Sequence, residues 1–241
     1  AVAEEDSFST QALSLLQPLD LNPEEIDSII LLIEKLYNIA SSQQNRSSEL
    51  VAPEVLLQTC LDVGVSNYPL LSSLLQGLHG AASIGRDTSR MLESTIRALQ
   101  EFQEKIPIEI SVECISTIIK YDPSLEFLLD DPELIAGVLP NEGEGYIKGL
   151  IQSLETLGFS SQEISWTLTD ILPALYRKGI TASSEIVPFL QGLKDTGTGH
   201  DLTYHELTYL IDLIVMLIEA ESASNLNQVI DGLNQILSLM D

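Results

Sequence analysis

The sequence predicts an all-α fold of about five helix-pair repeats, arranged either as a right-handed stack or as a compact multi-helix bundle. Three observations support this prediction. A leucine–glutamine phrase recurs along the chain, helical stripes of apolar residues begin at capping residues, and the composition is rich in leucine and isoleucine. With 241 residues and 44% hydrophobic content, the chain can bury a sizeable core.

The recurring phrase places glutamine directly after leucine or isoleucine. Successive glutamines from Gln17 to Gln191 are 41, 42, 52 and 39 residues apart, which is about the length of one helix pair. Self-similarity at this period is typical of tandem helical repeats. The copies are Leu16-Gln17, Leu57-Gln58, Leu99-Gln100, Ile151-Gln152 and Leu190-Gln191, with a looser one at Leu233-Asn234-Gln235.

Three segments have the same helical pattern after a capping residue. Apolar residues follow one another at steps of three and four over residues 26–37, 164–176 and 207–218, which is one face of an α-helix. The predicted capping residues are Asn22, which Pro23 follows, Ser160 with Glu163, and Thr203 with Glu206.

A second helix of each pair is predicted after a short polar break. We expect serine to cap it. The first two of these helices carry the phrase and are predicted to end at a glycine, while the third runs to the chain end; glycines six residues after a glutamine of the phrase are the predicted helix stops. The serines are Ser48, Ser184 and Ser224, and the glycines are Gly64, Gly158 and Gly197. Between these pairs, helices are predicted over residues 67–78 and 88–102 and from residue 111 to 119.

We predict one domain over residues 1–241, because no linker is long enough to divide it. The 52-residue interval contains Asp130-Asp131-Pro132 and an acidic, glycine-bearing run over residues 141–145. This composition predicts an acidic loop insertion near residues 130–145. The insertion is either a plain surface loop or the place where function departs from the repeat.

With this period and pairing of helices, the chain resembles the armadillo- or HEAT-like α-solenoids, whose units run about 40–47 residues. The resemblance covers nearly the whole chain and rests on no family-specific residues. It implies a superhelical stack with a concave surface that can bind a partner.

The formal net charge is −25, from 36 acidic and 11 basic residues. Nucleic acid and anionic membrane surfaces are disfavoured as partners, because both are bound through clustered Lys and Arg. The charge either keeps a leucine-rich protein soluble and monomeric, or forms a surface for a basic or cationic partner. The sequence contains no run of 18 or more apolar residues, so it predicts no membrane span.

Three features point to a secreted protein, with the cytoplasm as the alternative. The chain begins with small residues, as after cleavage of a signal peptide. Asn45 lies in the glycosylation sequon Asn45-Arg46-Ser47. Cys60 and Cys114 can form one disulfide in an oxidising compartment, or remain two buried thiols.

Tests for metal and catalytic motifs are negative. Residues 195–206 match the EF-hand outline at Asp195 and Glu206, but Gly197 and Gly199 stand where oxygen ligands belong. His200 and His205 are five residues apart, which does not place them on one helix face as zinc ligands. No nucleophile motif or phosphate loop occurs. We therefore expect no catalytic, cofactor or metal site and no enzyme.

The sequence leaves two functions open. The first is an interaction or structural protein whose acidic surface binds a protein or cationic partner, with Trp166 either an exposed contact or packed against a neighbouring repeat. The second is a carrier or storage protein for an apolar small molecule such as a lipid, fatty acid or pigment. Leu31, Leu32, Val215 and Met216, which widen the apolar stripes, support this alternative.

Overall fold

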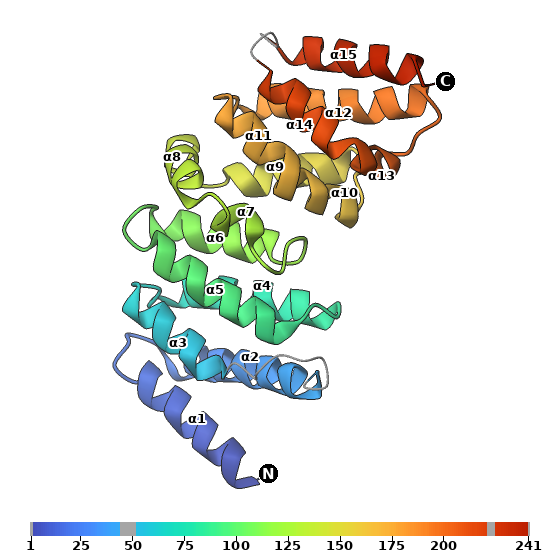
Figure 1. Ribbon diagram of the computed structural model, residues 1–241. Helices are drawn as coiled ribbons and strands as arrows, with labels where there is room; N and C mark the ends of the chain where they lie inside the picture. Colours follow the sequence, from blue (N-terminus) through green and yellow to red (C-terminus); the bar gives the residue numbers. More distant parts are fainter. Residues whose placement is uncertain (1, 44–51, 221–224, 241) are drawn as a thin grey trace. The chain divides into compact units, whose positions relative to one another are not determined.

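A computed structural model describes residues 2–43, 52–220 and 225–240, the side chains of residues 2–8 and 53 excepted. Within these residues every regular element is helical, so the all-α prediction is confirmed (Figure 1). The chain divides into two compact units, Ala1–Pro132 and Glu133–Asp241, where the sequence predicted one domain. Each unit is described by itself.

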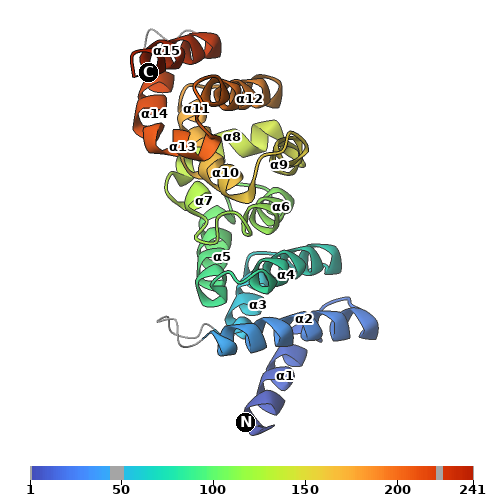
Figure 2. The same cartoon turned by 90° about the vertical axis from the view of Figure 1, so that its right-hand side faces the viewer.

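Unit 1 has two layers of helices. Helices α1, α3 and α5 contact one another in order, and α2, α4 and α6 do the same in the second layer (Figure 2). The bounds are α1 Val2–Leu16, α2 Pro23–Ser42, α3 Pro53–Asp62, α4 Tyr68–Ser83, α5 Thr88–Phe102, α6 Ile108–Ile118 and the single turn α7 Glu126–Leu129.

Unit 2 repeats this arrangement with less regular helices. Helices α9, α12 and α15 contact one another in order, while α10 and α11 pack against α13 and α14. The bounds are α8 Pro132–Glu142, α9 Tyr146–Thr156, α10 Ser161–Trp166, the π-helical turn η2 Thr167–Ile171, α11 Leu172–Arg177, α12 Ser183–Gly199, α13 Tyr204–Leu207, the 3-10 turn η3 Thr208–Leu210, α14 Ile211–Glu219 and α15 Leu226–Ser238.

The leucine–glutamine phrase marks one layer in each unit. In unit 1 it falls at the end of α1 and in α3 and α5, and in unit 2 it falls in α9, α12 and α15. The aliphatic residue of every copy is buried, and every glutamine is exposed or half-buried. The phrase therefore combines a core contact with the solvent-facing position next to it.

The predicted caps of the first helices are confirmed. Asn22, Ser160 and Thr203 each accept a hydrogen bond from a backbone N–H three residues on, and a glutamate there binds back to the cap. A cap of this kind stabilises a helix by about 1 kcal/mol. The predicted serine caps are less accurate: Ser184 lies inside α12, whose cap is Ala182, while Ser48 and Ser224 lie outside the described residues.

The predicted acidic loop near residues 130–145 is wrong, because most of this segment is the helix α8. Pro132 occupies the first helical position, where its missing N–H costs no hydrogen bond, and acidic residues stand next to it at the positive end of the helix. Gly143, with φ +85°, follows the last residue of α8. The acidic residues and the proline therefore mark the start of a helix, and the glycine marks its end.

The predicted glycine stops are right at two of three positions. Gly64 and Gly158 adopt φ of +93° and +83° and follow the C-cap residues of α3 and α9, Val63 and Leu157. Gly197 instead lies inside α12, where a Cβ would stand 2.9 Å from both the Leu202 carbonyl oxygen and Leu207 Cδ1. Glycine is needed there for close packing, and the chain turns later, at Asp201 with φ +57°.

Candidate functional site

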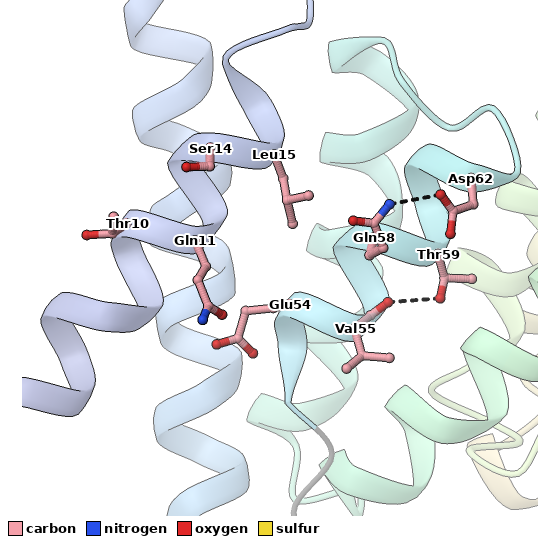
Figure 3. A pocket seen from close by; sticks show the side chains of 9 residues that line it. All are labelled: Thr10, Gln11, Ser14, Leu15, Glu54, Val55, Gln58, Thr59 and Asp62. Atoms are coloured by element: carbon pink, nitrogen blue, oxygen red, sulfur yellow. Dashed lines mark hydrogen bonds between the residues drawn. The ribbon is translucent and has the colours of Figure 1, made fainter.

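The candidate site is a groove of about 630 Å³ between α1 and α3 in unit 1 (Figure 3). Helix α1 contributes Thr10, Gln11, Ser14 and Leu15 to its lining. Helix α3 contributes Glu54, Val55, Gln58, Thr59 and Asp62.

Helical periodicity explains why these residues share the groove. On both helices the lining residues come in adjacent pairs, and each pair starts four residues after the one before it, with the single Asp62 continuing the series on α3. Because four residues make about one helical turn, each set lies on one face of its helix. The next faces of the same helices carry Ala12 and Leu16 on α1 and Leu56 and Leu57 on α3, all of them buried. Packing of these apolar faces fixes the two helices and leaves their polar faces to form the groove.

Hydrogen bonds hold part of the lining in place. Gln58 Nε2 donates to Asp62 Oδ1 at 2.8 Å, and Thr59 Oγ1 donates to the Val55 carbonyl oxygen at 2.8 Å (Figure 3). Glu54 Oε2 is different, because it is buried and accepts no hydrogen bond from the described residues. Figure 3 shows the Gln11 and Glu54 side chains pointing toward one another from the two helices.

The charge of the groove is negative. Glu54 and Asp62 are the charged side chains among the described residues that line it. Unit 1 as a whole has 21 acidic residues and seven basic ones. A carboxylate oxygen without a donor, in a negative groove open to solvent, is suited to an ammonium or guanidinium group.

The two cysteines are buried, free thiols on different helices, Cys60 on α3 and Cys114 on α6. The disulfide that their even number allowed is not formed in the structure. Burial raises the pKa of the Cys60 thiol to about 12 and also raises the pKa of the Cys114 thiol. Because the thiolate is the reactive form, neither side chain is suited to nucleophilic chemistry. Asn45, the predicted glycosylation site, lies outside the described residues.

Trp166 is not the exposed contact that the sequence allowed, because only 8% of it is exposed. Its ring packs edge-on against Tyr204, with the centroids 4.7 Å apart, and Phe159 packs on the same tyrosine at 5.1 Å. The Trp166 side chain therefore joins α10 to α13 in the core of unit 2. The π-helical turn that follows precedes Pro173, whose ring excludes a normal helical hydrogen bond.

The residues tested for metal binding do not converge. Asp195 accepts a hydrogen bond from Gln191 within α12, His200 lies 3.3 Å from Asn234 Oδ1, and His205 packs edge-on against Tyr209. No group of three or more His, Cys, Asp or Glu side chains that could hold a metal ion occurs in the part of the chain that the structure describes.

Of the groove residues, the sequence singled out Gln58 as part of the leucine–glutamine phrase, but it did not predict a site there. Glu54, Gln58 and Asp62 follow one another at steps of four, a signal that is readable in the sequence but common to every solvated helix face. These residues differ from other solvated positions because α1 lies opposite them, and only the fold shows that arrangement.

Comparison of the chain with protein-family models, curated proteins and solved structures found no match. No helix among the described residues is long and apolar enough to cross a bilayer.

Proposed function

We propose that this protein is a non-enzymatic interaction protein, built from tandem helix pairs, that binds a basic segment of a partner protein in the α1–α3 groove. The observation that carries the proposal is the Glu54 carboxylate oxygen, which accepts no hydrogen bond from the described residues, in an open groove whose described charged lining residues, Glu54 and Asp62, are acidic. A lysine or arginine of the partner would complete the hydrogen bonding of Glu54. Secretion, expected from the sequence, stays a prediction.

Support for the repeat architecture comes from hydrogen bonds that join positions about one helix pair apart. Their sequence separations fall between 34 and 43 residues, close to the period of the leucine–glutamine phrase. The pairs are Gln43 with the Arg86 carbonyl, Arg86 with the Lys120 carbonyl, Arg177 with Glu219, Lys178 with the Ala220 carbonyl and Lys194 with the Gly158 carbonyl. Contacts between successive copies are what a stack of α-solenoid repeats requires.

Support for a non-enzymatic role comes from the groups whose pKa is strongly shifted. They are Cys60, Cys114, Tyr146 and Tyr204, and burial is the main cause in each case. Active sites gather such groups in one cleft. These four lie on four different helices, α3, α6, α9 and α13, and none of them lines the groove.

The test is a titration with a fluorescent 12-residue peptide of lysine, serine and leucine, beside a peptide with glutamate in place of lysine. We expect only the lysine peptide to bind, and Glu54→Gln to weaken binding about tenfold, since a hydrogen bond to a charged group contributes about 1.5 kcal/mol. Glu93→Gln, an exposed acid on α5 of the same unit, is the matched control. Equal affinity for wild type and Glu54→Gln would contradict the proposal.

The alternative, a carrier for an apolar ligand, has less support. Leu31 and Met216, which widened the apolar stripes, are 50% and 60% exposed, and Leu32 and Val215 are half-buried. An aliphatic ligand cavity would be lined by buried side chains. Native mass spectrometry of the gently purified protein separates the two functions, because a carrier would retain a bound apolar molecule.

A further inference from the structure

The helix α14 leaves an apolar face exposed in unit 2. Tyr209, in the 3-10 turn η3 directly before α14, forms this α14 face together with Asp212, Leu213 and Met216 of α14 itself. Tyr209 is 78% exposed and Met216 60%, while Leu213 is half-buried. The buried positions Ile214 and Ile218 pack into unit 2, where α14 contacts α11 and α15.

The neighbouring helix α15 gives a comparison as far as its last residue, Ser238; Leu239 and Met240, which follow it, are exposed. The exposed positions within α15 are polar: Asn227, Gln228, Asp231, Gln235 and Ser238. The α14 face instead presents a phenol, an aliphatic side chain and a thioether within two turns. Single exposed apolar residues are ordinary, but a contiguous group of them marks a contact surface.

Charge identifies the kind of partner. Asp212 is exposed within the α14 face, and unit 2 has 15 acidic residues against four basic ones. Three of the four are engaged within the unit: Arg177 with Glu219, Lys178 with the Ala220 carbonyl and Lys194 with Glu163. A second copy of this chain would bring two strongly negative surfaces together. The same negative potential attracts a basic partner.

We propose that the α14 face docks an amphipathic helix of a partner protein, with leucine-like residues on one side and lysine or arginine along its edges. Tyr209 and Met216 would be the anchors, since tyrosine and methionine are enriched at protein interfaces and helix recognition uses anchors at three- and four-residue spacing. Asp212 would pair with a basic residue of the incoming helix. This surface is separate from the α1–α3 groove, which belongs to unit 1.

The experiment uses the full chain and an 18-residue helical peptide of leucine and lysine with one apolar side. Its control is a scrambled peptide of the same composition without that side. We expect the amphipathic peptide to protect the backbone amides of residues 208–219 from hydrogen exchange and the scrambled peptide not to. The double variant Tyr209→Ser/Met216→Ser should weaken binding at least tenfold while leaving the circular dichroism spectrum unchanged.

Two further variants make the outcome specific. Leu31→Ser removes a similarly exposed leucine from α2 of unit 1 and should leave peptide affinity unchanged. Glu54→Gln, which tests the groove, should leave the protection of residues 208–219 unchanged, so that failure at one surface is distinguishable from failure at the other. The proposal is overturned if the double variant binds like the wild type, if both peptides bind equally, or if sedimentation shows a dimer that the double variant abolishes.

Discussion

The α1–α3 groove of unit 1 and the α14 face of unit 2 are both surfaces that helix packing leaves uncovered, but they expose different chemistry. In the groove, two helices turn polar faces toward one another, and a carboxylate oxygen remains without a donor. At the α14 face, the turn η3 and the helix α14 leave a tyrosine and a methionine exposed beside a half-buried leucine. The difference implies that partners are selected mainly by charge at the first surface and mainly by apolar contact at the second.

The largest expected effect separates a core side chain of unit 2 from a surface side chain of the same unit. Trp166→Ala should destabilise the protein by about 3–5 kcal/mol, because it empties a buried aromatic contact with Tyr204. Met216→Ala should change the free energy of unfolding by less than about 0.5 kcal/mol, as surface substitutions do. Urea unfolding measures both. A large loss for Met216→Ala would show that this residue supports the fold and would weaken its role as an anchor.

The second expected effect concerns alkaline pH. The Cys60 thiol, directly behind the groove on α3, has its pKa raised by burial from 9.0 to about 12, and the Tyr146 phenol of unit 2 is raised from 10.0 to about 12. At a pH between the ordinary pKa of each group and its raised pKa in the folded protein, the group ionises in the unfolded chain but stays neutral in the folded chain. The free energy of unfolding is therefore highest below pH 9 and falls as the pH rises. At pH 10 the Cys60 thiol alone should cost about 1 kcal/mol.

The urea midpoint at pH 8 and pH 10 measures this loss. The matched variant Cys60→Ala removes the ionising group, so the difference between the two midpoints should shrink even though the variant is less stable at both. An unchanged difference would mean that other groups cause the alkaline loss.

Local rules predicted the start of helices better than the surfaces they form. Asn22, Ser160 and Thr203 could be read from the sequence because a capping box depends only on residues three apart. The leucine–glutamine phrase likewise marks one layer in each unit, since a buried residue and its outward neighbour are adjacent in sequence. Both signals are short-range.

Where the sequence-based predictions differ from the structure, the cause is either a tertiary contact or a local rule that was given too little weight. Gly197 looked like a helix stop, yet its role depends on the Leu202 carbonyl and Leu207 packed against it. For Trp166 the sequence left exposure and packing both open because the residue lies off one stripe, and the fold decides for packing since α13 supplies a second contact face. The helix α8 was readable from Pro132 and Gly143 and was missed because acidic composition was given more weight than the positions of the two residues.

The smallest expected effect tests the comparison of the two surfaces directly. Charge-based binding is screened by salt, with a Debye length of about 10 Å at 0.1 M and about 3 Å at 1 M, while apolar burial is not. Raising the salt from 0.1 to 1 M should therefore weaken the lysine peptide at the α1–α3 groove severalfold more than the amphipathic peptide at the α14 face. Fluorescence anisotropy with each peptide gives the two slopes, using Glu54→Gln and Tyr209→Ser/Met216→Ser to assign each signal to its surface. Equal slopes would mean that both surfaces select partners by charge alone, and the apolar side chains of α14 would then contribute nothing to recognition.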